Sequence, residues 1–333
     1  MQLTDQQANV ATIVASYWTI SISMVYLNKI LLSPDISIPA PLFITFYQCL
    51  ITTLICYVCG TLSSRGGWYS QFPKPELNLS TARAVMPLSI VFVAMITFNN
   101  ICLKYVEVSF YNVARSLTLV FNVVLSFLLL GSTSSQKTLS CLGVVVLGFF
   151  IGSAGEMHFS FAGTLSGILS SLFVSLNSIF TKKILPVVND NHWRLTYYNN
   201  LNALALFTPL IIIFEREQLV ENIDKMGAIF WSSMTLGGCL GFAIGIVTVL
   251  QIKATSPLTH NISGTAKAAF QSILAFWIWQ NPATFKGVVG IACVLGGSLL
   301  YTVVKMRENE KKKELPVASE RRQEMQPLRG QNP

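Results

Sequence analysis

Ten stretches of about 20 apolar residues, separated by short polar segments, constrain this chain more than any other feature. They lie near residues 10–31, 41–62, 84–103, 108–130, 136–154, 161–181, 195–214, 228–250, 257–279 and 285–305. A helix needs about 20 apolar residues to cross the hydrocarbon core of a bilayer. Because 52% of the 333 residues are hydrophobic and only 11% are charged, the composition excludes an ordinary water-soluble globule. The pattern predicts an all-α membrane protein with ten transmembrane helices embedded in a lipid bilayer.

The charged residues indicate how the chain is oriented. Most of the 23 Lys and Arg residues lie in the connections on the side of both termini, and such connections usually face the cytosol. Residues 1–9 are therefore expected to be a cytosolic N-terminus, and the polar residues 306–333 a disordered cytosolic tail. The net charge of +8 then reflects topology and tail, which argues against a nucleic-acid partner. The seven cysteines lie in or beside the spans, and their spacing supports neither a metal site nor a cofactor.

The two halves of the chain match each other at a constant offset of 149 residues. The polar matches are Asn28 with Asn177, Lys104 with Lys253, Asn112 with Asn261, and Lys137 with Lys286. Each unit contains five spans, and because five is odd the second unit enters the membrane from the opposite face. We therefore predict a five-plus-five inverted repeat, residues 10–156 and 157–305. Many secondary transporters have this architecture, with the substrate site near the midplane between the halves.

Two cations, Arg115 and Lys267, lie inside the spans, and no Asp or Glu lies in any span. A charge at the centre of a bilayer costs about 3 kcal/mol on insertion scales, so such residues usually face a cavity, a partner or a ligand. An unpaired positive charge predicts an anionic ligand. The alternative is that these side chains join helices through hydrogen bonds. Lys29, near the luminal end of the first span, is expected to extend its ammonium to the membrane surface.

Other polar residues share helix faces with the two cations. The face of Arg115 carries Tyr111, Thr118 and Asn122, and the face of Lys267 carries His260, Gly264 and Gln271, each 149 residues after its counterpart. Asn28 lies on a similar face of the first span, with Tyr17 and Ser21. These faces are expected to line a central cavity. For Asn112, Asn122 and Gln271, hydrogen bonds between helices remain an equal alternative.

The seventh span opens with Tyr197, Tyr198, Asn199 and Asn200. Amides present donors and acceptors to the edge of a planar heterocycle, and tyrosines offer a stacking face. The cluster therefore predicts a ligand that contains a ring, whereas the tyrosines alone would suit an aromatic belt at the membrane surface. The spans contain no carboxylate, no pair of histidines and no H-E-x-x-H motif, which argues against an enzyme.

Five segments resemble the nucleotide-sugar transporters of the drug/metabolite transporter superfamily, and the resemblance covers residues 10–305. They are FNNICLKYVEVSFYNVARSLTLVFNVV (98–124), SLNSIFTKKILP (175–186), WRLTYYNN (193–200), TLGGCLGFAIG (235–245) and LQIKATSPLTHNISGTAKA (250–268). The resemblance implies a ten-helix protein of the Golgi or endoplasmic reticulum. Such a protein exchanges a cytosolic nucleotide sugar for a luminal nucleoside monophosphate by alternating access, and a homodimer is left open.

The resemblance also implies roles for individual residues. GDP-sugar transporters have Phe-Tyr-Asn-Asn at the start of helix seven to recognise guanine, and this chain has Tyr197-Tyr198-Asn199-Asn200. The branch that carries GDP-mannose has Gly-Ala-Leu-Asn-Lys in helix nine, whereas this chain has Ser-Gly-Thr-Ala-Lys at 263–267. That difference argues against GDP-mannose and fits the branch that carries GDP-fucose.

The implied activity is antiport of GDP-fucose and GMP in the Golgi membrane. Another GDP-sugar such as GDP-mannose, or a smaller organic phosphate, is the alternative substrate. Lys267 and Arg115 would balance the phosphates, while Asn199 and Asn200 would bind the guanine edge. The candidates for contacts with phosphate, ribose or sugar hydroxyls are His260, Ser263, Thr265 and Gln271.

Overall fold

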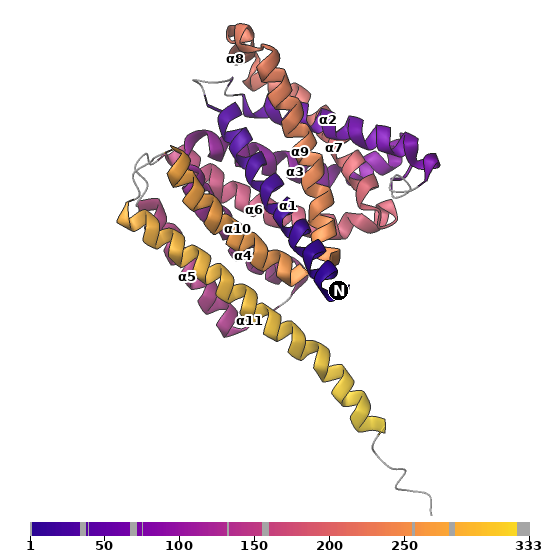
Figure 1. Cartoon of the computed structure of the whole chain (residues 1–333), viewed down its shortest axis with the longest axis vertical. Coiled ribbons are helices and arrows are strands. Elements are labelled where there is room, and N and C mark those ends of the chain that lie inside the picture. Colours follow the sequence, from indigo (N-terminus) through magenta and orange to yellow (C-terminus); the bar gives the residue numbers. More distant parts are fainter. Residues whose placement is uncertain are drawn as a thin grey trace, which may run out of the picture.

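The computed structural model describes residues 2–33, 38, 40–66, 72–74, 76–131, 133–154, 160–254, 257–279 and 284–324. The side chains of 2–9, 257–262, 309–324 and a few single positions are not described. Every regular element in the described ranges is helical, and the long helices pack side by side (Figure 1). Helices are expected in hydrocarbon because each one satisfies its own backbone hydrogen bonds there.

Ten of the described helices are long. They are α1 (Gln2–Leu31), α2 (Pro41–Thr61), α3 (Leu79–Tyr105), α4 (Val108–Leu130), α5 (Gln136–Ala154), α6 (Phe161–Ile184), α7 (His192–Phe214), α9 (Ala228–Ala254), α10 (Pro257–Trp279) and α11 (Phe285–Glu324); α8 (Arg216–Glu221) is a short connection. Nine are long and apolar enough to cross a membrane. The tenth, α10, has 23 residues and carries Lys267. The expected all-α, ten-helix fold is confirmed.

Asparagine side chains fix where two of these helices begin. Asn78 accepts a hydrogen bond from the backbone N–H of Ser80 at 2.9 Å, which caps α3. Asn191 accepts one from the N–H of Arg194 at 3.0 Å, which caps α7. Such caps satisfy N–H groups that have no partner inside the helix. The start of α7 at His192 places residues 197–200 in its second and third turns.

The contact between α5 and α11 shows the repeat at atomic level. A Cβ atom built on Gly148 would lie 2.9 Å from Val294 Cγ2, and one built on Gly297 would lie 2.9 Å from Val145 Cγ2. The two contacts interchange under the 149-residue offset, because 148 corresponds to 297 and 145 to 294. Helix pairs obey the same relation: α3 packs on α6 as α9 packs on α1, and α3 packs on α7 as α9 packs on α2. This packing agrees with a pseudo-twofold inverted repeat.

We expect Gly290→Ala to destabilise the protein by about 1–3 kcal/mol, because overpacking displaces backbone. A Cβ atom on Gly290 would lie 2.4 Å from both Cα and N of Gly152 on α5. The measurement is thermal unfolding of the purified protein in detergent. Gly296→Ala is the matched control, since nothing lies within 4 Å of a Cβ on Gly296. Equal melting temperatures of the two variants would contradict the close approach of α5 and α11.

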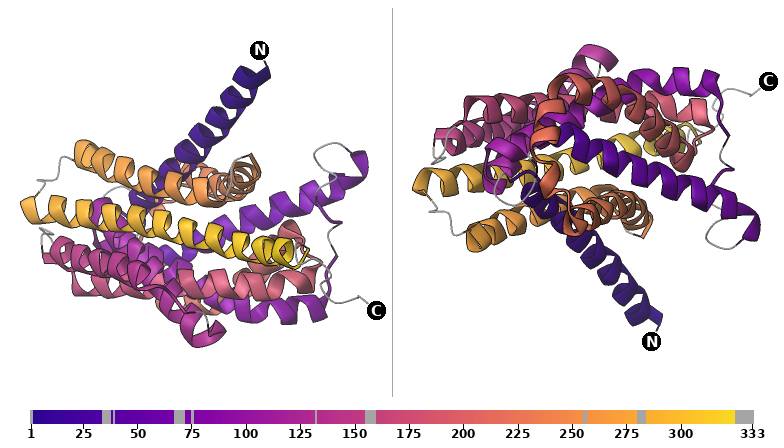
Figure 2. Two further views of the ribbon diagram at one scale, coloured as in Figure 1. Left: turned by 90° about the horizontal axis from the view of Figure 1, so that it is seen from below. Right: turned by 90° about the horizontal axis from the view of Figure 1, so that it is seen from above.

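The pair α1 and α10 departs most from this symmetry. The offset relates the pair α4 and α6 to the pair α10 and α1. Helix α4 packs along α6, whereas α10 contacts α1 at only a few residues. The first half of α1 leans away from the other helices in both views of Figure 2. We call the side where α1 begins the N-terminal face. The two repeats are therefore in different conformations, and α1 packs less closely on α10 than α6 packs on α4.

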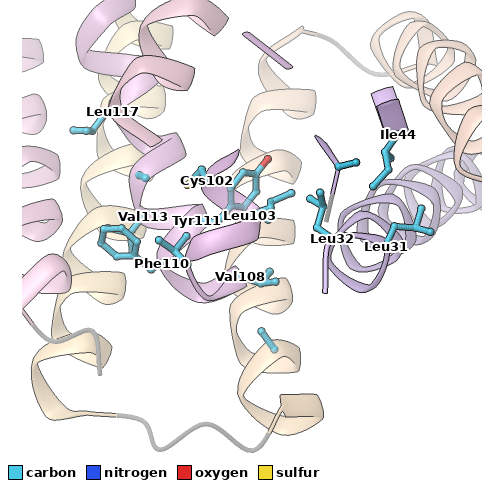
Figure 3. Close-up of a cluster of buried hydrophobic side chains, with 14 of the residues drawn as sticks. Leu31, Leu32, Ile44, Cys102, Leu103, Val108, Phe110, Tyr111, Val113 and Leu117 are labelled. Carbon is cyan, nitrogen blue, oxygen red and sulfur yellow. The ribbon is translucent and has the colours of Figure 1, made fainter. Parts of the chain in front are cut away.

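The side where α1 ends, which we call the opposite face, is closed by apolar side chains. Leu31 and Leu32 at the end of α1 belong to one buried cluster with Ile44 of α2 and Leu103 of α3 (Figure 3). The cluster extends to the start of α4 through Phe110. Burying side chains of this size excludes water from the space between the helices. The structure is sealed at the opposite face.

Hydrogen bonds from α1 reinforce this seal. The Lys29 ammonium donates to the carbonyl oxygens of Leu103 at 2.7 Å and Val106 at 2.6 Å, at the end of α3. Lys29 therefore binds the C-terminus of a neighbouring helix, where carbonyl groups lack partners within the helix. Its expected extension to the membrane surface stays a prediction. Tyr26 donates to the backbone oxygen of Gln271 in α10 at 2.6 Å. Neighbouring residues of α1 thus connect it to α3 and to α10.

The last helix is longer than the sequence pattern predicted. We expected disorder from residue 306, but α11 continues to Glu324 and projects beyond the other helices (Figure 1). Its sequence there is rich in Glu, Lys and Arg, which favour helix. Glu308 also accepts hydrogen bonds from the hydroxyls of Ser135 and Thr138 at the start of α5. These contacts attach α11 to α5 at the N-terminal face.

Candidate functional site

Arg115 lies in the first half of α4, within a chain of hydrogen bonds. Its guanidinium Nη1 donates to the hydroxyl of Tyr111 at 2.7 Å, and Tyr111 donates to Asn99 Oδ1 of α3 at 3.0 Å. Ser170 of α6 also points its hydroxyl at Asn99 Oδ1, at 3.4 Å. Arg115 retains a large solvent-accessible area although its neighbours on α4, from Tyr111 to Ala114, are buried. Since its partners lie on α3 and α4, this accessible area opens between the helices.

Lys267 extends from α10 toward α1. Its Nζ atom donates to the hydroxyl of Ser21 at 2.5 Å and lies 5.5 Å from the ring centroid of Tyr17. A cation over the face of an aromatic ring is attracted by the ring quadrupole. A hydroxyl and a ring stabilise the ammonium but leave its full positive charge. Ser21 and Tyr17 were expected to share the polar face of the first span, and the structure brings that face to Lys267.

The two cations form one electropositive centre. Tyr17 interacts electrostatically with Arg115 as well as contacting Lys267, and the charges of Arg115 and Lys267 repel each other. In the described part of the chain, neither cation has a carboxylate oxygen within 4.0 Å, so neither forms a salt bridge. We call this set, Arg115, Lys267, Tyr17, Ser21 and Tyr111, the basic centre. It can neutralise an anion that enters between α1, α4 and α10.

The asparagine and tyrosine cluster of α7 is buried between helices. Tyr197, Tyr198, Asn199 and Asn200 are all at most 9% exposed, so they do not form a belt that faces lipid. Tyr198 donates to the backbone oxygen of Glu76 at 2.5 Å and accepts from the N–H of Asn78 at 3.1 Å. Those bonds attach α7 to the segment before α3.

The two amides of this cluster differ in what they contact. Asn200 donates one hydrogen bond to the carbonyl oxygen of Thr196 at 2.9 Å, within its own helix. Asn199 Oδ1 is buried and has no hydrogen-bond partner among the described residues. A buried carbonyl oxygen without a donor costs about 1–3 kcal/mol, so its presence indicates a missing partner.

The other candidates on α10 have mixed surroundings. Ser263 accepts hydrogen bonds from the indole N–H of Trp18 at 2.8 Å and from Gln251 Nε2 at 3.0 Å, so it joins α10 to α1 and α9. A Cβ atom on Gly264 would lie 3.9 Å from the hydroxyl of Tyr17, beside the basic centre. Thr265 is half-buried, two residues from Lys267 and therefore on another helix face. The side chain of His260 lies outside the described residues.

Two predicted residues lie farther toward the opposite face. Gln271 follows Lys267 by one turn, is 1% exposed, and its Nε2 has no partner among the described residues. Asn28 is 7% exposed and accepts a hydrogen bond from Gln48 Nε2 at 2.8 Å. The structure thus places Asn28 in a contact between α1 and α2. A role of Asn28 in binding substrate stays a prediction.

Two further residues could hardly be found from sequence patterns. Asn99 accepts the hydrogen bond of Tyr111 beside Arg115, but in the sequence it is one of two adjacent asparagines without a helical stripe. Glu215 follows the end of α7 and accepts hydrogen bonds from the N–H groups of Leu42 and Phe43, both at 2.8 Å. Burial raises the pKa of Glu215, while those two N–H groups and Lys104 oppose the rise. Glu215 caps α2 at the opposite face, which a pattern confined to the spans could not reveal.

A ten-helix bundle of this kind, with a basic centre inside the membrane, defines a multi-pass membrane transporter. Residues 8–302 match the Triose-phosphate Transporter family, and the chain belongs to that family, within the drug/metabolite transporter superfamily. A solved structure described only as "Crystal structure of protein" aligns with a TM-score of 0.56 and 15% identity, covering 90% of this chain and 98% of that one. That likeness shows a shared fold.

Curated relatives are similar over most of their length. "GDP-fucose transporter 1" of Mus musculus is 52% identical over 312 residues, which cover 92% of this chain and 86% of the mouse protein. "GDP-fucose transporter" of Caenorhabditis elegans is 47% identical, with 92% and 85% covered. "GDP-fucose transporter, Golgi" of Drosophila melanogaster is 43% identical, with 92% and 93% covered. The predicted family resemblance is confirmed.

Proposed function

We propose that this protein imports GDP-fucose from the cytosol into the Golgi lumen in exchange for GMP, by alternating access. The observation that carries the proposal is the basic centre, in which two cations lie between membrane-spanning helices beside hydroxyls and a tyrosine ring. Relatives at 43–52% identity are named for GDP-fucose transport. Both termini then face the cytosol, as the distribution of Lys and Arg predicts.

The basic centre suits the phosphates of both ligands. Arg115 offers a planar set of N–H donors that suits bidentate contact with a phosphate, whereas Lys267 acts as a compact charge. Opposite charges about 4 Å apart attract by about 4 kcal/mol at an effective dielectric constant near 20. GDP-fucose and GMP share the phosphate next to the ribose, so both can use this centre. An empty carrier leaves the two positive charges uncompensated, which favours movement of the loaded form and hence exchange.

Asn199 supplies an acceptor for the base. The Watson–Crick edge of guanine carries an N–H and an amino group, both donors, next to a carbonyl acceptor. The orphaned Oδ1 of Asn199 can accept from one of those donors, and the second Nδ2 hydrogen of Asn200 can serve the carbonyl. Uracil and cytosine present different edges, so this pairing favours a guanine nucleotide.

The packing supports a conformation that receives ligand from the cytosol. The opposite face is closed by the Leu31 cluster and by Lys29, while α1 packs loosely on α10 and its first half leans away from the other helices (Figure 2). In an inverted repeat, interchanging the conformations of the two halves produces the state open to the other side. We expect α10 then to pack on α1 as α4 now packs on α6.

Reconstitution tests the proposal directly. Proteoliposomes preloaded with GMP should accumulate GDP-fucose in preference to GDP-mannose, UDP-sugars and CMP-sugars, and uptake should fall to background without internal GMP. Preference for a UDP-sugar would overturn the assignment of Asn199 and Asn200. Equal uptake from empty vesicles would overturn the exchange mechanism.

A smaller organic phosphate is the second candidate substrate, because the matching family is named for triose-phosphate transport. Such a ligand would use the basic centre without the α7 cluster. Competition separates the two: GMP should inhibit uptake of GDP-fucose, and a triose phosphate at the same concentration should not. Stronger inhibition by the triose phosphate would favour the second candidate.

A further inference from the structure

Asn99 uses its amide differently from three other asparagines of the helix bundle. Asn100, Asn112 and Asn202 are buried, and each donates from Nδ2 to a residue on another helix: Thr45, Ser272 and Ser89 respectively. Asn99 is only partly buried, and its hydrogen bonds in the described structure all reach Oδ1. Its Oδ1 joins α3 to α4 and α6, and no hydrogen bond in the described structure engages its Nδ2 atom.

The chemistry of the neighbours assigns the orientation of this amide. Arginine only donates hydrogen bonds, so the Tyr111 oxygen must accept from Arg115 Nη1 at 2.7 Å. The single hydroxyl hydrogen of Tyr111 is then free for an acceptor, and it reaches Asn99 at 3.0 Å. The Asn99 atom on that side must be the carbonyl oxygen Oδ1, since an NH2 group there would oppose the Tyr111 hydrogen. Arg115 itself lies 3.5 Å from the same oxygen.

This orientation of the Asn99 amide affects Arg115 in two ways. By accepting from Tyr111, Asn99 fixes the tyrosine lone pairs toward the guanidinium, and hydrogen bonds in such a chain strengthen one another. The Nδ2 atom then points away from Tyr111, next to a guanidinium that keeps accessible area. Two N–H donors beside a cation add to the donors that an anion meets there.

We propose that Asn99 is a positioning residue for Arg115 and a donor to the phosphate of the transported nucleotide. This inference rests on the proposed function, since it assumes that the basic centre binds a phosphate. The Oδ1 atom aligns Arg115 through Tyr111, and the Nδ2 atom donates to a phosphate oxygen. Neutral donors next to Arg115 let the site bind a phosphate tightly without a third repelling cation.

Ligand-dependent thermal stability of the purified full chain in detergent tests this role without requiring transport. The probes are GMP, which carries a phosphate, and guanosine, which does not. Apparent affinities follow from the rise in melting temperature with ligand concentration. We expect Asn99→Ala to lower the affinity for GMP by roughly tenfold, as for the loss of hydrogen bonds to a charged group. The affinity for guanosine should stay unchanged. Asn99→Asp should lower the affinity for GMP further, because its carboxylate neutralises Arg115.

The adjacent asparagine is the matched control. Asn100 is 1% exposed and donates to Thr45 Oγ1 at 2.7 Å, so Asn100→Ala should lower the melting temperature of the empty protein. It should leave the ratio of GMP to guanosine affinity as in the wild type. Asn99→Gln, which keeps the amide, should recover part of the GMP affinity.

Three results would contradict the proposed function or the proposed role of Asn99. If GMP does not stabilise the wild type, the proposed function fails. If GMP stabilises the wild type and Asn99→Ala equally, the role of Asn99 fails and the function stands. If Asn99→Ala lowers the affinities for GMP and for guanosine by the same factor, Asn99 has a structural role and the inference is again wrong.

Discussion

Replacing Lys267 with alanine should reduce exchange of GDP-fucose for GMP in proteoliposomes by roughly 100-fold or more. Removing one partner of a desolvated charge contact typically costs about 2–5 kcal/mol, and each 1.4 kcal/mol corresponds to about tenfold. In the empty protein the Lys267 ammonium contacts only a hydroxyl and a ring among the partners that the structure describes. Its charge is therefore available to the ligand, and no neighbouring cation can replace it at the same place.

Stability gives a second readout for the same variant. Lys267→Ala removes a partly buried charge that repels Arg115, so the melting temperature of the empty protein should not fall. Lys137→Ala is the control, because Lys137 is exposed at the start of α5 and should transport normally. Normal exchange by Lys267→Ala would refute the basic centre as the substrate site. A lower melting temperature would show that Lys267 supports the fold instead.

Arg115→Lys should reduce exchange by roughly tenfold to 100-fold although it keeps the positive charge. A lysine ammonium is a point donor and cannot reproduce the planar pair of N–H groups that binds two oxygens of a phosphate. It is also shorter and loses the alignment that Tyr111 gives to Arg115 Nη1. Arg115→Ala, which loses the charge too, should be worse still. Initial rates of uptake at several GDP-fucose concentrations measure both effects.

The matching substitution Arg83→Lys controls for the change of residue type. Arg83 is exposed in the first turns of α3, so its geometry should not matter to transport. If Arg115→Lys and Arg83→Lys both transport like the wild type, the centre needs charge alone and bidentate contact is excluded. Arg115 would then act only electrostatically.

Much of the fold could be predicted from the chain itself. Each hydrophobic window satisfies its own backbone hydrogen bonds as a helix, so the number and limits of the spans follow from local composition. The 149-residue offset predicted which elements correspond, and the reciprocal contacts of Gly148 and Gly297 agree with it. The end of α11 was missed, because the charged segment after residue 305 is helical as well as polar.

Some residues of the site could also be predicted from the sequence. Arg115 and Lys267 stand out because a charge in hydrocarbon is costly, whatever the tertiary structure. Asn99 does not stand out, since one polar side chain in an apolar helix has many possible partners. Its importance depends on which helix faces it, and a single helix does not contain that information.

The sequence by itself determined the set of helices, their repeat and the presence of unpaired positive charge. These follow from local composition and from comparing the two halves of the chain. Only the tertiary structure decided that Tyr17 lies beside Lys267, that Tyr111 joins Arg115 to Asn99, and that Lys29 binds the end of α3. It also distinguished Asn199, whose Oδ1 has no partner among the described residues, from Tyr198, which binds the segment before α3. Most of these contacts join residues on different helices, so their geometry is set by how the helices pack.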